Sequence, residues 1–219
     1  MDQELQQDIL FFGIQYFCFL FSLSVHEAAH AVTADRCGDP TGRLLGRITL
    51  NPIKHIDPIG TVVMPLLMFV TGIPYLFGWA KPVPFNPNNL KNFRRDPALI
   101  AAAGPISNVL IAVVTVLLLR LGFAVLGVER MMELHLVEVG LMMVAINLLL
   151  FLFNLIPVPP LDGGHILRSL LPSGGQQMLD SIGPFGILIA IFVGSRFLSA
   201  PLAFLQEFVI YAITWGIAV

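Results

Sequence analysis

Charged side chains are scarce in this chain: they make up 12 % of its 219 residues, about half of the roughly 25 % found in an ordinary soluble domain. Basic residues are in no excess either, since 12 Lys and Arg stand against 14 Asp and Glu and give a net charge of −2. The low charge excludes a soluble enzyme and a disordered chain. The lack of a basic field excludes nucleic-acid binding, which depends on neutralising phosphates.

Two other features are missing. The chain has only two cysteines, Cys18 in an apolar helical stretch and Cys37 in a loop, so we expect two reduced thiols and no disulfide framework. Residues 1–8 contain three acids and no Lys or Arg, and no small-residue cleavage site follows them. A secretory signal peptide is therefore excluded.

Hydrophobic residues, at 56 %, are abundant, and the mean hydropathy is +0.83. A helix needs about 20 apolar residues to cross the bilayer, which predicts an all-α polytopic membrane protein with five to six membrane segments in a single membrane-embedded domain, residues 1–219. The 19 Gly and 16 Pro indicate that some of these helices are interrupted. The expected segments are Ile9–Val25, continuing as a helix to about Asp35, then Ile59–Phe77, Leu99–Leu119, Leu136–Ile156, Ile182–Gly194 and Phe208–Val219.

The orientation depends on the second segment, Ile59–Phe77, which contains two Gly and two Pro. Four cations precede it and four follow it, and they lie on one side of the membrane only if the segment dips in and returns. Because short cytoplasmic loops hold the excess of Lys and Arg, we expect a re-entrant segment. The N-terminus of this multi-pass protein of the cell (inner) membrane would then lie outside, and the first and fourth spans would end at the cytoplasmic side.

Residues 26–30, at the end of the first span, read His-Glu-Ala-Ala-His. Two histidines four residues apart share one helix face, so both imidazoles can reach one zinc ion. Glu27 beside them is placed to take a proton from the attacking water. The alternative is a pair of interfacial histidines with a snorkelling glutamate.

A catalytic zinc site takes three protein ligands, and the third candidate follows the fourth span. Residues 154–164 read Asn-Leu-Ile-Pro-Val-Pro-Pro-Leu-Asp-Gly-Gly. The three prolines break the helix, and the two glycines are expected to let the chain turn after Asp162. This predicts a broken fourth helix that brings Asp162 to the same side as the histidines. Alternatively, Asp162 is the N-cap of a short helix at 163–171.

Four motifs together resemble the site-2 protease family of intramembrane zinc metalloproteases: residues 26–30, the Asn154–Gly164 stretch, Phe77–Pro84 (Phe-Gly-Trp-Ala-Lys-Pro-Val-Pro) and Ala103–Asn108 (Ala-Gly-Pro-Ile-Ser-Asn). The resemblance covers about residues 20–172. It implies one zinc ion per chain held by His26, His30 and Asp162, with Glu27 as catalytic base, and cleavage of a transmembrane segment of another protein. The catalytic core would be about residues 9–172. The C-terminal helices at 182–219 match no family motif, and no segment resembles the PDZ or CBS domain that many members carry.

Two asparagines belong to these motifs. The amide of Asn154 would stabilise the oxyanion or hold the substrate backbone, or else satisfy carbonyls at the end of its helix. Asn108 would make an interhelical hydrogen bond or contact the substrate.

Residues 47–51 alternate in polarity and lie between Gly46 and Pro52. They predict a small β-hairpin at the cytoplasmic interface, in which Ile48, Thr49 and Leu50 either form an edge strand that pairs with an extended substrate or serve only the structure.

The leading hypothesis is an intramembrane zinc endopeptidase acting on single-span membrane proteins in regulated intramembrane proteolysis. Its partners would be the lipid bilayer, the transmembrane substrate and a regulatory membrane protein. One rival is a membrane metal-ion transporter, because His, Glu and Asp at membrane depth also line ion pathways. The other is a non-catalytic relative that binds transmembrane helices, against which the intact Glu27 argues.

Overall fold

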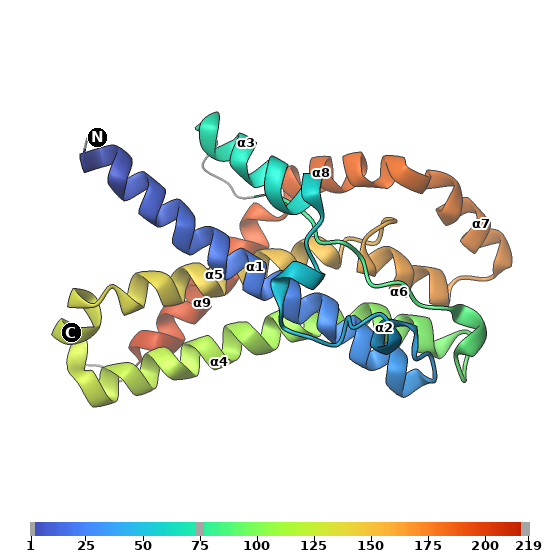
Figure 1. Cartoon of the computed structure of the whole chain (residues 1–219), viewed down its shortest axis with the longest axis horizontal. Helices are drawn as coiled ribbons and strands as arrows, with labels where there is room; N and C mark the ends of the chain where they lie inside the picture. Colours follow the sequence, from blue (N-terminus) through green and yellow to red (C-terminus); the bar gives the residue numbers. More distant parts are fainter. Residues whose placement is uncertain (1–2, 73–76, 216–219) are drawn as a thin grey trace.

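The computed structural model describes residues 3–72 and 77–215, which form nine α-helices (Figure 1). The α-helices are α1 (Gln3–Cys37), α2 (Thr41–Leu44), α3 (Met64–Val70), α4 (Arg95–Glu133), α5 (Leu136–Asn154), α6 (Asp162–Leu170), α7 (Ser173–Ile182), α8 (Gly186–Phe197) and α9 (Ser199–Thr214). Shorter helical turns are η1 (Pro52–Lys54), the π-helical η2 (Pro58–Val63), η3 (Pro87–Asn89) and η4 (Gly183–Phe185).

Three of the described helices, α1, α4 and α5, are long and apolar enough to cross a membrane, and a fourth span results if α7 and α8, bent by 80°, are counted as one. These three confirm the first, third and fourth expected segments. The expectation of five to six spans is not confirmed, because α9 and the η2–α3 pair are too short. Gly183, with φ +50, breaks the chain between α7 and α8. Residues 73–76 and 216–219 of the second and last expected segments lie outside the described residues.

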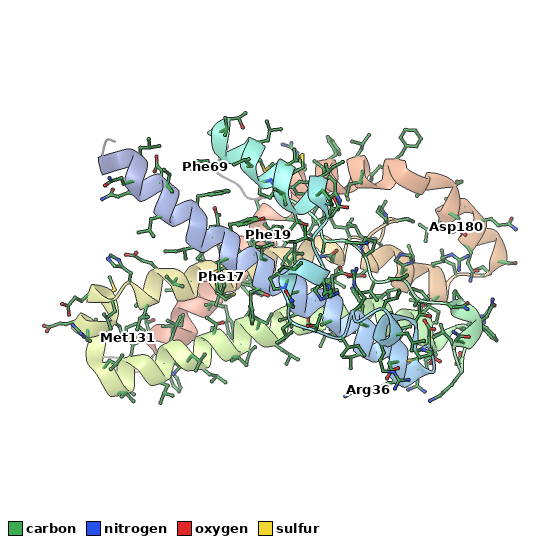
Figure 2. The ribbon with its side chains drawn as sticks, in the orientation of Figure 1. Phe17, Phe19, Arg36, Phe69, Met131 and Asp180 are labelled. Carbon is green, nitrogen blue, oxygen red and sulfur yellow. The ribbon has the colours of Figure 1, made fainter. Side chains whose placement is uncertain are left out.

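The long helices α1, α4 and α5 pack against one another, with α4 and α5 running antiparallel (Figure 1). Large apolar side chains fill their contacts: Phe19 and Leu23 of α1 belong to one buried cluster, and Met131 of α4 lies in another near the α4–α5 turn (Figure 2). Outward-facing side chains such as Leu110 and Leu117 are more than half exposed. Such apolar exposure suits contact with lipid.

The fourth predicted helix is broken as expected: α5 ends at Asn154 and α6 begins at Asp162. The role expected for the two glycines was wrong, because Gly163 and Gly164 are helical residues of α6. A Cβ on Gly163 would lie 2.3 Å from Leu155 O, and one on Gly164 would lie 2.5 Å from Pro159 N. The glycines therefore let α6 pack directly on the backbone of the proline-rich segment.

The segment that follows α3 returns to the start of η2 and bonds to it. The Thr61 hydroxyl donates to Trp79 O at 2.9 Å, and Lys81 N donates to His55 O at 2.8 Å. Asp57 caps the outgoing turn by accepting from Ile59 N and Gly60 N. Residues before η2 and after residue 78 therefore lie side by side.

The predicted β-hairpin is absent, since no residue in the described ranges forms a β-strand. Residues 47–51 form an irregular loop whose polar groups are bonded to side chains: Asn51 N donates to Thr49 Oγ1, and Thr49 O lies 2.9 Å from His55 Nε2. Burial lowers the pKa of the His55 imidazole. The β-hairpin is not formed because local side-chain bonds take the place of strand pairing. Pairing of Ile48, Thr49 and Leu50 with an extended substrate stays a prediction.

A buried carboxylate, Asp39, ties the segment after residue 81 to the end of α1. It accepts from Asn86 N at 2.7 Å, from Asn89 Nδ2 at 2.8 Å and from the Thr41 hydroxyl at 2.6 Å. Burial by itself would raise the pKa of the Asp39 carboxyl, but the hydrogen bonds outweigh it and lower the pKa below its usual value. Asp39 thereby holds residues 86–89 beside the C-terminal end of α1.

Replacing Asp39 by alanine is expected to lower the free energy of unfolding by about 1–3 kcal/mol, because buried donors lose their acceptor. Since the folded pKa is depressed, this stabilisation is complete above the unfolded pKa of about 3.9 and is lost as pH falls through the folded value. Thermal unfolding in detergent at pH 7 and pH 3 measures both effects. Equal unfolding temperatures of Asp39→Ala and wild type at pH 7 would contradict this role.

Candidate metal centre

Both histidines of the residue 26–30 motif lie on one face of α1, as the spacing predicts. Their rings are 4.6 Å apart between centroids and nearly perpendicular, at 85°. The Nδ1 atom of His26 lies 2.7 Å from Asn108 Oδ1, and the Nδ1 atom of His30 lies 2.7 Å from Ile100 O. Both Nδ1 atoms are thus engaged by α4, which leaves both Nε2 atoms for another partner.

Asp162, the first residue of α6, faces these two Nε2 atoms. Its Oδ2 lies 3.1 Å from His26 Nε2, and its Oδ1 lies 3.4 Å from His30 Nε2. The alternative role as a helix cap receives no support, because no side-chain cap bond begins α6, whose N-cap residue is Leu161. The broken fourth helix brings its carboxylate to the histidines of the first.

These residues fit a metal ion. A backbone carbonyl only accepts, so Ile100 O requires the proton of His30 on Nδ1 and leaves a lone pair on Nε2. Asp162 Oδ2, a buried oxygen, has no hydrogen-bond partner in the described part of the chain despite its 3.1 Å distance from His26 Nε2. Tetrahedral zinc with ligands at 2.0–2.1 Å separates its donor atoms by about 3.3 Å. The 3.1 and 3.4 Å distances match that spacing, so a cation would relieve the repulsion between the converging lone pairs.

Glu27 lies next to this donor set. One ligand atom from each of His26, Glu27 and His30 lies within 4.8 Å of the other two. Glu27 is 9 % exposed, and its Oε2 accepts a hydrogen bond of 3.0 Å from Val83 N. The backbone at Val83, in the segment before η3, therefore holds one carboxylate oxygen of Glu27.

A cavity of about 180 Å³ opens onto the donor set. Asn154 lines it, but its Nδ2 also donates to Leu150 O at 2.9 Å, so the helix-end role considered for it is present. Ile48, Thr49 and Leu50 are not among its lining residues. The cavity is lined by His26, Glu27, His30, Pro82, Val83, Phe85, Pro97, Ile100, Ala101, Asn154, Pro160, Asp162 and His165.

Three features that shape the metal centre were not predicted from the sequence. They are the bond from Val83 N to Glu27, the amide of Asn147, and the contact between Gly104 and the imidazoles. Asn147 of α5 accepts from Asn108 Nδ2 at 2.9 Å. A signal for it existed, because it is an amide within an otherwise apolar run of the fourth span, and polar groups at that depth usually bond between helices. The interhelical bond considered for Asn108 is confirmed.

Gly104 of α4 packs directly on the two imidazoles. A Cβ there would lie 2.5 Å from both His26 Nε2 and His30 Nε2, closer than atoms can approach. Gly104→Ala is expected to displace the rings and lower activity by about 100-fold, the loss expected for a misplacement of about 1 Å. Zinc content and peptide cleavage measure the effect. Gly13→Ala, on a helix with open space around the added methyl, is the matched control, and equal behaviour of the two variants would contradict the prediction.

Known proteins similar to this chain are described as peptidases and zinc metalloproteases. The model of peptidase family M50 matches residues 121–193, which include Asp162. The chain is 37 % identical over 191 residues to "Putative zinc metalloprotease YwhC" of Bacillus subtilis, covering 86 % of this chain and 83 % of that protein. It is 28 % identical over 184 residues to "Putative zinc metalloprotease Rip2" of Mycolicibacterium smegmatis and 30 % identical over 175 residues to Rip2 of Mycobacterium tuberculosis H37Rv, covering 79 % of this chain and 63 % of each relative. No solved structure matches the chain significantly.

Proposed function

Because the chain belongs to peptidase family M50, the site-2 protease family, we propose that it is an intramembrane zinc endopeptidase that cleaves peptide bonds within or next to transmembrane segments of other membrane proteins. It is a zinc-dependent, multi-pass membrane protein. The observation that carries the proposal is the convergence of His26 Nε2, His30 Nε2 and the Asp162 carboxylate within 3.1–3.4 Å. That donor set leaves room for water and substrate on the cavity side.

Each residue of the centre has a defined task in the proposed reaction. His26, His30 and Asp162 would hold the ion, which would supply Lewis-acid chemistry for the attacking water and the scissile carbonyl. Glu27 takes the proton of the attacking water and later gives it to the leaving amine. The hydrogen bond from Val83 N fixes the rotamer of Glu27, so that its carboxylate stays beside the donor set throughout.

Asn154 has a proposed role at the rim of the cavity. Its Nδ2 bonds to Leu150 O, while the side chain faces the same cavity as Glu27 and Asp162. We propose that the amide turns from the carbonyl to the substrate backbone when an extended peptide enters. An extended substrate needs such partners because cleavage requires its helix to unwind.

The fold supports the re-entrant topology. Since Thr61 bonds to Trp79 and Lys81 bonds to His55, the chain enters and leaves the η2–α3 region at one level. We propose that the N-terminus lies outside and that the metal centre faces the cytoplasmic side of the cell membrane. A reporter inserted at the exposed Asn88 is expected to read as cytoplasmic, and an extracytoplasmic reading would overturn this topology.

The proposed activity is tested with purified protein in liposomes that contain a panel of single-span membrane proteins. We expect cleavage inside the membrane-spanning segment, its loss after zinc is removed with a chelator, and its return when zinc is added back. Zinc transport into the liposomes without cleavage would support a transporter instead. Binding of the panel without cleavage, in protein shown to hold zinc, would support a non-catalytic relative.

A further inference from the structure

A chain of buried polar side chains leads from the metal centre into the contact between α1, α4 and α5. His26 Nδ1 lies 2.7 Å from Asn108 Oδ1, and Asn108 Nδ2 donates to Asn147 Oδ1 at 2.9 Å. Asn147 Nδ2 then donates to Ser22 Oγ at 2.8 Å. Ser22, Asn108 and Asn147 are all 0 % exposed. Burying three polar side chains at membrane depth is costly unless all are bonded to one another, so the chain needs an explanation beyond packing.

The direction of this chain is fixed at its far end by backbone carbonyls, which can only accept. The Ser22 hydroxyl donates to Cys18 O at 2.7 Å, so its oxygen is left to accept from Asn147. Asn147 Nδ2 also donates to Met143 O at 2.8 Å. Turning the Asn147 amide over would place its oxygen against the Met143 carbonyl oxygen, which repels it. Asn147 therefore presents its oxygen to Asn108.

The orientation of Asn147 in turn determines which nitrogen of His26 carries the proton. Because Asn147 Oδ1 accepts, Asn108 must turn its NH₂ group towards Asn147 and its oxygen towards His26. Asn108 Oδ1 can only accept, so the proton of His26 lies on Nδ1. In the neutral imidazole, the Nε2 atom, which faces Asp162 at 3.1 Å, is then left with its lone pair free for a metal ion. His30 reaches the same state by a shorter route, since its Nδ1 faces the carbonyl of Ile100 directly.

We propose that Ser22, Asn147 and Asn108 are positioning residues that set the tautomer of His26, so that the histidine meets the metal with Nε2 already unprotonated. This inference rests on the ligand set given under Proposed function. The two histidine ligands then differ in how they are oriented. His30 is oriented by a backbone carbonyl, whereas His26 depends on three side chains from α1, α5 and α4. Outer partners of this kind fix ring orientation and change metal affinity by about 10–100-fold.

The test compares variants along the chain by two measurements. Nitrogen-15 NMR of histidine-labelled, metal-free protein reads the tautomer of His26, and competition with a chromogenic chelator gives the zinc affinity. Asn108→Leu is expected to mix the tautomers and weaken zinc binding by about 10–100-fold, and Asn147→Leu to weaken it by about tenfold. Asn108→Asp, which keeps an oxygen acceptor facing His26, is expected to retain the Nδ1–H tautomer.

Ser24 is a matched control for Ser22, the third positioning residue. Ser22 and Ser24 are both buried, at 0 % and 1 % exposure, and each donates to the carbonyl four residues back at 2.7 Å. Only Ser22 accepts from Asn147. Ser22→Ala is expected to weaken zinc binding by less than about tenfold, below the usual range for outer partners, because Met143 O still holds Asn147. Ser24→Ala is expected to leave tautomer and affinity unchanged.

The outcomes separate this inference from the ligand set on which it rests. If Asn108→Leu and Asn147→Leu keep the wild-type tautomer and zinc affinity while His26→Ala loses zinc, the positioning role is wrong and the ligand set stands. If His26→Ala itself binds zinc as tightly as wild type, the ligand set is wrong. The expected result is a graded loss from Asn108 through Asn147 to Ser22.

Discussion

Glu27→Gln is expected to lower the rate of peptide cleavage by about 10²–10⁴-fold, the usual contribution of a general base, while zinc stays bound. Glutamine has the shape of glutamate, and its carbonyl oxygen can still accept the hydrogen bond from Val83 N that Glu27 Oε2 accepts now. It cannot take a proton from water. The variant therefore removes one chemical step and little else, and comparing kcat with KM in the liposome assay would locate the loss in kcat.

The control for this variant is Glu138→Gln on α5. Glu138 is exposed and pairs with His135 at 2.9 Å, so the same substitution there changes one charge at the opposite end of the span. We expect its cleavage rate to equal that of wild type. Cleavage by Glu27→Gln within about tenfold of wild type would exclude Glu27 as the base, since a general base contributes at least about 10².

Asp162→Ala is expected to weaken zinc binding by more than about 100-fold, because losing a direct ligand costs more than the 10–100-fold caused by outer partners. Its carboxylate oxygens lie 3.1 and 3.4 Å from the two Nε2 atoms, and alanine offers no donor. Metal analysis of purified protein and chelator competition measure the loss. Cleavage is expected to fall with zinc content.

Two controls accompany Asp162→Ala. Asp180→Ala on α7 removes an exposed carboxylate that pairs with Arg168 and is expected to keep one zinc ion per chain. Asp162→Ser retains a good helix-capping side chain, so it would rescue a residue that served only to cap α6. Full zinc content in Asp162→Ala, or its restoration in Asp162→Ser, would remove Asp162 from the ligand set.

The parts of this fold that could be predicted from sequence are those where short-range rules act alone. The 26–30 spacing needs only a helix to place His26 and His30 on one face, and α1 provides it. Three prolines within four residues break any helix, and α5 ends before them at Asn154. Because both motifs also follow long apolar runs, their meeting could be inferred from topology alone.

The parts that failed depend on particular side-chain bonds, some of them local and some between distant segments. The alternation at Ile48–Leu50 is typical of a strand, but His55 and Asn51 bond to Thr49 instead. Val83 bonds to Glu27, and Asp39 bonds to Asn86 and Asn89, across about fifty residues that no local pattern encodes. The C-terminal segments were counted as spans from hydropathy, whereas α9 is too short to span the membrane and α8 counts only together with α7, across the bend at Gly183.

The central claim is that one zinc ion is held by His26, His30 and Asp162, and X-ray absorption at the zinc K-edge of the purified protein tests it most directly. We predict one zinc ion per chain with only nitrogen and oxygen ligands at about 2.0–2.2 Å. The spectrum should show two imidazoles in wild type and one in His30→Ala. A sulfur ligand at about 2.3 Å, which would place the ion on Cys18 or Cys37, or an unchanged imidazole number in His30→Ala, would contradict the account.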